Sequence, residues 1–154
     1  MSARKPALDP RSVEAVNRSG YPEPYRSRVL PRCKRRIGDA LGLTRIGINY
    51  TVLPPGKESS MRHWHTHEDE FVFVLEGEVV LRSEAGEQLL RAGMCAGFPA
   101  GVEDGHQLIN RSAADAVYLE VSNRDSADGA HYSDPEVDLA WSRGRFTRRD
   151  GTPL

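Results

Sequence analysis

Cysteine, long apolar runs and an excess of charge of one sign are all scarce in this chain of 154 residues. Its two cysteines, Cys33 and Cys95, are far apart in sequence, which is typical of reduced intracellular thiols rather than of a disulfide framework. No run approaches the roughly 18 apolar residues of a membrane-spanning helix, and the first ten residues lack the apolar region of a secretory signal. The net charge of −1 provides no broad basic field. We therefore expect a cytoplasmic protein with no nucleic-acid and no membrane partner.

Proline and polar residues set the two ends of the chain apart from its middle. Residues 1–42 carry five prolines, which break helices and central strands, so they predict an N-terminal arm with one helical turn near residues 12–17. Residues 123–154 are again polar, but they contain scattered large apolar side chains, which a disordered segment would not need. They predict an ordered C-terminal tail that packs on the middle of the chain or on a partner subunit, through Tyr132, Val137, Leu139, Trp141 and Phe146.

Short β-rich segments fill the middle of the chain, with glycine or proline between them. This spacing is typical of an all-β sandwich or barrel, here over residues 43–122. A hairpin turn is expected at residues 83–87. The expected strands cover residues 45–53, 71–75, 79–81, 88–91, 94–98, 107–109 and 116–121.

Histidine is also rare, but four of the five histidines lie in two clusters, with His63, His65 and His67 in the first and His106 in the second. Side chains alternate along a strand, so the three imidazoles of the first cluster share one face. Glu70 follows, and by the same alternation it faces inward with the apolar residues at 72 and 74. A carboxylate buried alone in an apolar barrel is costly, and a metal ion would supply its partner. Imidazole and carboxylate suit iron, manganese, cobalt, nickel or zinc, while the alternative is a set of solvated surface histidines.

The spacing of these residues resembles the two motifs of the cupin superfamily. The resemblance implies an all-β double-stranded β-helix, or jelly-roll barrel, with the arm and the tail outside it. Compared with the usual motifs, the first spacer is one residue longer and the second has a two-residue insertion. In this chain the first motif reads Gly56, six residues, His63-Trp64-His65, four residues, Glu70, six residues and Gly77. The second reads Gly93, five residues, Pro99-Ala100-Gly101, four residues, His106, three residues and Asn110.

The resemblance also selects the ligands. It implies that one divalent transition metal ion is bound by His63, His65, Glu70 and His106, which leaves His67 as a rim or supporting residue.

The insertion in the second motif brings Glu103 and Asp104 to the mouth of the barrel. They are candidates for an outer acid or base, although an ordinary polar turn is the alternative. His131 lies in an acidic stretch that we interpret as a solvated turn, and the direction of Tyr118 depends on strand register.

Cupins include dioxygenases, decarboxylases, isomerases, lyases and binding proteins, so the resemblance does not choose a reaction. We expect a metal-dependent enzyme acting on a small oxygen-rich metabolite such as a carboxylate, a diketone or a sugar acid. The alternative is a metal-dependent binding or sensing protein without turnover. A homodimer is also expected, because Trp64, Phe71, Phe73 and Leu75 lie on strand faces that point away from the ligands and need a cover.

Overall fold

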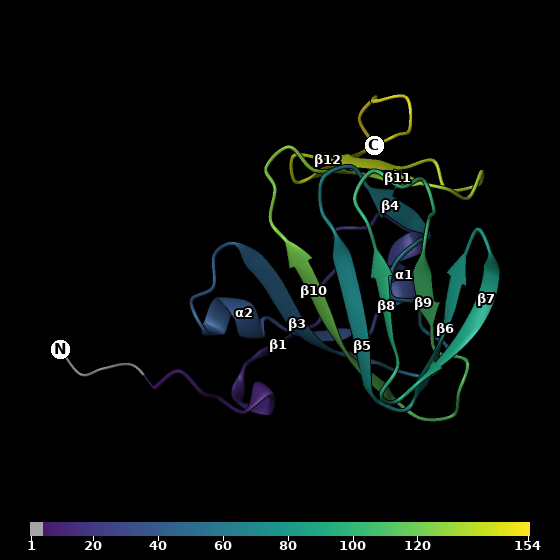
Figure 1. The fold of residues 1–154 in the computed structure, drawn as a ribbon. Coiled ribbons are helices and arrows are strands. Elements are labelled where there is room, and N and C mark those ends of the chain that lie inside the picture. The colour runs from purple at the N-terminus through teal and green to yellow at the C-terminus, as the bar shows by residue number, and fades with distance from the viewer. Residues whose placement is uncertain (1–4) are drawn as a thin grey trace.

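Antiparallel strands dominate the computed structural model, which describes residues 5–154; the first four residues of the expected arm lie outside the described part. Two sheets form the barrel (Figure 1). The larger has the order β1 (Ala15–Val16), β2 (Cys33–Arg35), β3 (Ile46–Leu53), β10 (Ala116–Asn123), β5 (Glu70–Glu76), β8 (Cys95–Phe98). The smaller has the order β7 (Gly86–Arg91), β6 (Glu78–Ser83), β9 (Gln107–Ile109). The all-β barrel expected from the sequence is confirmed.

Strand β5 follows the alternation that its sequence predicts. Val72 and Val74 are buried, with 7% and 0% of their surface exposed, while Phe71 and Leu75 on the other face are 40% and 37% exposed. Glu70 begins the strand on the buried face, so its carboxylate enters the barrel together with the two valines. The alternation of this one strand therefore aims the carboxylate of Glu70 inward.

The barrel interior is a single apolar cluster to which both sheets contribute. Fully burying a side chain of the size of valine or leucine contributes about 1.5–3 kcal/mol each, so this cluster holds the two sheets together. Its buried members are Leu53, Val72, Val74, Val79, Leu81, Leu90, Leu108, Ala116 and Tyr118.

The C-terminal tail forms a third sheet, which crosses one end of the barrel (Figure 1). Its order is β13 (Arg145–Thr147), β12 (Ala140–Ser142), β11 (Gly129–Tyr132), β4 (His63–His65). Because β4 belongs to this sheet, the tail is bound directly to the strand that carries the first two histidines. A second apolar cluster packs beneath it, formed by Tyr21, Val29, Met61, Ala130, Tyr132, Val137 and Leu139.

The N-terminal segment is more regular than its prolines suggest. Strand β2 pairs with β3, so the segment expected as an arm outside the barrel extends the larger sheet. The turn expected at residues 12–17 is replaced by a 3-10 turn at Pro10–Ser12, where the side chain of Asp9 accepts a hydrogen bond from the Arg11 amide. Two short helices follow, α1 (Tyr25–Val29) and α2 (Ile37–Ala40). The hairpin turn is also tighter than expected, because the β6–β7 register continues to the pair Ser83–Gly86.

Candidate metal centre

Strand pairing brings the two histidine clusters together. His63 and His65 are the first and last residues of β4, and His106 lies just before β9. His63 and His106 form an isolated antiparallel bridge, with their backbone amide and carbonyl groups bonded in both directions at 3.2 and 2.9 Å. Two residues 43 positions apart are therefore held side by side by main-chain bonds, and the centroids of their imidazole rings lie 4.9 Å apart.

The imidazoles converge on the carboxylate of Glu70. Its Oε2 lies 2.7 Å from His106 Nε2 and 3.7 Å from His63 Nε2, and its Oε1 lies 3.5 Å from His65 Nε2. Neighbouring donors around an ion with bonds of about 2.0–2.2 Å lie roughly 3.0–3.5 Å apart. His63, Glu70 and His106 have donor atoms close enough to share one ion, and His65 approaches the same carboxylate at its other oxygen.

Hydrogen bonds at the far side of two rings fix which nitrogen faces the centre. His63 Nδ1 donates to the Met61 carbonyl at 2.8 Å, and His65 Nδ1 donates to Asp128 Oδ2 at 2.6 Å. Since carbonyl and carboxylate oxygens only accept, both Nδ1 atoms carry the proton and both Nε2 atoms offer a lone pair. Supporting bonds of this kind orient histidine ligands at metal sites. His106 has no such partner among the described residues, since its Nδ1 is buried without a hydrogen bond.

The electrostatics of the cluster keep it in the state that binds metal. Burial lowers the pKa of His63 to about 4, so this imidazole is neutral at physiological pH. Burial would raise the pKa of Glu70, but the hydrogen bond to His106 and the nearby histidines outweigh it and lower the pKa to about 2. Metal ligands must be deprotonated, and the neutral imidazole of His63 and the ionised carboxylate of Glu70 already meet that condition.

The donor set fits a divalent transition ion. Glu70 Oε2 is buried, and the cluster atoms nearest to it are imidazole nitrogens, His106 Nε2 at 2.7 Å and His63 Nε2 at 3.7 Å, so a divalent cation bound among them would balance the charge of the carboxylate. His63, Glu70 and His106 have donor atoms that all lie within 4.8 Å of one another. Three imidazoles and one carboxylate are the ligands that the borderline divalent ions prefer.

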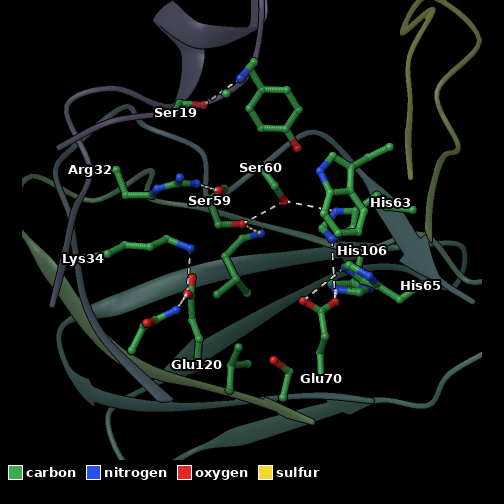
Figure 2. Close-up of a pocket in the computed structure, with 18 of the residues that line it drawn as sticks. Ser19, Arg32, Lys34, Ser59, Ser60, His63, His65, Glu70, His106 and Glu120 are labelled. Carbon is green, nitrogen blue, oxygen red and sulfur yellow. Dashed lines mark hydrogen bonds and ion pairs between the residues drawn. The ribbon is translucent and has the colours of Figure 1, made fainter. Parts of the chain in front are cut away.

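A cavity of about 430 Å³ extends from the four ligands toward the N-terminal segment. Figure 2 shows Arg32, Lys34 and Glu120 on the side of this pocket that lies opposite the histidines. Lys34 Nζ and Glu120 Oε2 form an ion pair at 2.7 Å. Burial lowers the pKa of Lys34 more than the charge of Glu120 raises it. The volume lies within the range of about 300–1,000 Å³ that is usual for small-molecule sites.

The structure places the other candidate residues that the sequence suggested in different surroundings. Asp104 is half-buried and lines a small cavity of about 50 Å³ beside His65, Glu70 and His106, where its Oδ1 accepts the Glu84 amide at 2.8 Å. Glu103, the other candidate acid or base, is exposed, and Tyr118 is fully buried in the barrel core. Of the two remaining histidines, His67 is exposed, and His131 is exposed on β11 and stacks on Trp64.

Asp128 is the supporting residue that sequence reasoning missed. The acidic stretch that contains it was expected to be a solvated turn, and this is wrong for Asp128 and Asp134, which are 2% and 4% exposed. Asp128 is buried because β11 pairs with β4 and carries the loop before it onto His65. Nothing local marks Asp128, since its partner is 63 residues away.

Glu120 was missed as well, although its signal was present. It shares the inward face of β10 with Ala116 and Tyr118, both fully buried. An acidic residue on that face, like Glu70 on β5, has to find a partner.

Comparison with known proteins places the chain in a family. Residues 49–122 match the sequence profile of the cupin domain. The crystal structure of a sugar phosphate isomerase of the cupin superfamily from Silicibacter pomeroyi is 43% identical, covers 97% of this chain and 96% of its own, and has a TM-score of 0.90. The chain belongs to the cupin superfamily. The resemblance of the two motifs is thereby confirmed.

Other solved cupins extend the comparison. A candidate sugar phosphate isomerase from Acidithiobacillus ferrooxidans is 31% identical over 75% of this chain and 74% of its own, with a TM-score of 0.68. A predicted oxalate decarboxylase from Thermotoga maritima shares 18% identity over 76% of this chain and 97% of its own, with a TM-score of 0.62, and supports the fold alone. A search of curated proteins finds no match. Among the described residues, no helix of this cupin is long and apolar enough to span a membrane.

Proposed function

We propose that this cupin is a metal-dependent isomerase acting on a small phosphorylated sugar, with one divalent transition ion bound by His63, His65, Glu70 and His106. The observation that carries the proposal is the convergence of three Nε2 atoms on one half-buried carboxylate at the end of a cavity of about 430 Å³. The names of the relatives at 43% and 31% identity support this reaction class.

An isomerase of this kind moves a carbonyl group along a sugar. A base removes a proton from the carbon beside the carbonyl, an enediolate forms, and the proton returns to the former carbonyl carbon. The hydroxyl on the neighbouring carbon gives its proton to the former carbonyl oxygen, so that the new carbonyl forms there. No oxidant or reductant is consumed. The ion would act as a Lewis acid toward the substrate oxygens. Asp104 is the better placed of the two predicted proton carriers, because it lines the small cavity beside His106 whereas Glu103 is exposed.

Metal analysis tests the binding site. Purified protein is expected to contain about one transition ion per chain, and the double variant His65→Ala/His106→Ala should lose most of it. His131→Ala is the matched control, because this histidine is exposed on β11 and its ring stacks on Trp64 rather than facing Glu70. Full metal occupancy in the double variant would rule the site out.

Proton exchange tests the reaction. The metal-loaded protein is incubated with aldose and ketose phosphates in D₂O, and NMR follows both isomerisation and the entry of deuterium at the carbon beside the carbonyl. Asp104→Asn should lower turnover by about 10²-fold or more at unchanged metal content, whereas Glu103→Gln should have little effect. Binding of metal and sugar phosphates with neither exchange nor isomerisation would identify a non-catalytic binding protein instead.

We also propose a homodimer formed through the outer face of the larger sheet. Leu119 lies in register with Phe73 on one side and with Tyr50 on the other, which makes a row of large apolar side chains across β5, β10 and β3. Phe71 and Leu75 are exposed on the same strand as Phe73. A contiguous apolar face of this kind is typical of a protein–protein interface.

A further inference from the structure

The end of the large pocket that lies away from the histidines is rich in arginine. Arg18, Arg32 and Arg36 all line it, and none of them forms an ion pair with a carboxylate among residues 5–154. All three come from the N-terminal segment. The chain as a whole has a net charge of −1, so this concentration of unpaired cations is local to the pocket.

Arg32 is the cation of this group that most needs a partner. Only 8% of the surface of Arg32 is exposed, so its guanidinium group is largely removed from water. One nitrogen donates to the Ser59 carbonyl, but among residues 5–154 the buried Nε has no hydrogen-bond partner and Nη2 has none either. A buried charge without a counter-ion costs several kcal/mol, and an anion entering the pocket would recover that cost.

The carboxylate of Glu120 also lines this part of the pocket, but it is bonded to other groups and forms no ion pair with Arg32. Glu120 Oε2 accepts from Lys34 Nζ at 2.7 Å and from Asn49 Nδ2 at 3.3 Å. Burial would raise the pKa of Glu120, but the charges of Lys34 and Arg32 outweigh it and lower the pKa. Arg32 therefore acts on Glu120 through its charge alone, and it lines the cavity without an ion pair to a carboxylate of residues 5–154.

We infer that this arginine-lined end of the pocket is a phosphate subsite, in which Arg32 binds the phosphate group of the substrate and the exposed Arg18 and Arg36 complete its charge balance. The inference rests on the proposed function, which it deepens by naming the group that is recognised. Guanidinium offers a planar pair of N–H donors that matches phosphate oxygens, and a phosphate monoester carries the double charge that several arginines can balance.

This assignment also orients the substrate. With the phosphate at the arginines, the carbonyl end of the sugar points along the cavity toward His63, His65 and Glu70 (Figure 2). The N-terminal segment would then determine specificity, since it distinguishes a phosphorylated sugar from a free one. The metal bound by the three histidines and Glu70 would act on the oxygens that the phosphorylated and the free sugar have in common.

Calorimetric titration of metal-free protein, kept in EDTA, tests the subsite apart from the metal. The probes are inorganic phosphate, ribose 5-phosphate, free ribose and acetate. Wild-type protein is expected to bind the two phosphates and to bind ribose and acetate far more weakly. Arg32→Gln should weaken phosphate binding about tenfold or more, because a hydrogen bond to a charged group in a buried site is lost. Arg26→Gln, an exposed arginine paired with Glu23 outside the pocket, is the control and should bind like wild type.

A second variant keeps the test decisive if Arg32→Gln does not fold. Arg18→Gln/Arg36→Gln changes only exposed residues and should weaken phosphate binding a few-fold, as expected for solvent-screened charges. Wild-type phosphate affinity in both arginine variants, no phosphate binding by the wild type, or equal binding of acetate would each overturn the subsite.

The histidine variant separates this inference from the proposed function. His65→Ala/His106→Ala should bind phosphate as the wild type does, although it has lost its metal. Loss of phosphate binding in this variant would overturn the subsite by placing the anion at the histidine end. Phosphate binding at Arg32 together with no isomerase activity in metal-loaded protein would leave the subsite standing and refute the isomerase.

Discussion

Replacing Asp128 by asparagine should weaken metal binding without removing a ligand. In the present structure Asp128 Oδ2 accepts from His65 Nδ1 at 2.6 Å, while Oδ1 accepts the backbone amides of His67 and Glu68 at 2.9 and 3.1 Å. The asparagine oxygen can still serve the two amides, so the loop keeps its shape. Its NH₂ group then faces His65 Nδ1 and can only donate, which forces the ring proton onto Nε2.

The size of the effect follows from that change of tautomer. An Nε2 that carries a proton offers no lone pair to an ion, so binding must first reverse the tautomer against the new hydrogen bond. The side chain of Asp128 is 1% exposed, so water does not replace the lost partner. Changes of this kind typically cost 10–100-fold in metal affinity, or about 1.4–2.8 kcal/mol.

Competition with a metallochromic chelator would measure the affinity. Asp125→Asn is the matched control, because this exposed residue lies in the same loop and its carboxylate accepts only the Ala127 amide at 2.8 Å, away from any imidazole. The control should retain wild-type affinity. If Asp128→Asn also does so while its circular dichroism is unchanged, the argument that Asp128 sets the tautomer of His65 is refuted.

Three further predictions concern acid stability, packing and assembly. In the unfolded state His63 binds a proton at the ordinary pKa of 6.5, whereas in the folded state its pKa is about 4. Metal-free protein should therefore lose roughly 3 kcal/mol of its unfolding free energy as the pH falls from 6.5 to 4. Urea titrations should show this loss, and His63→Gln should flatten it. Gly105→Ala would bring a Cβ to 2.8 Å from Ser133 Cβ and should cost about 1–3 kcal/mol, which Gly105→Ala/Ser133→Gly should restore; an unchanged melting temperature in the single variant would contradict this. Wild-type protein should have a dimeric mass by light scattering at micromolar concentration and Leu119→Glu a monomeric one, so a monomeric wild type would exclude the dimer.

Strand positions and the inward direction of Glu70 could be predicted because they depend on neighbours in the sequence. Alternation over residues 70–76 is enough to put Glu70 and Val72 on one face, and glycine is enough to end the strand. At Gly77 the backbone has a φ of +72°, and a Cβ would lie 2.7 Å from the Asp115 carbonyl, so only glycine fits the turn. His63 and His65 were predicted to share a face for the same local reason.

Long-range packing decided what supports and surrounds those residues. Asp128 reaches His65 only because β11 adds to β4, and Lys34 meets Glu120 only because β2 adds to the edge of β3, over sequence separations of 63 and 86 residues. No periodicity in the acidic tail or in the proline-rich segment encodes these partners. The sequence by itself therefore determined the barrel and the inward carboxylate, through local steric rules. The tertiary structure alone decided which distant groups complete the pocket, because burial and pairing are properties of the assembled fold.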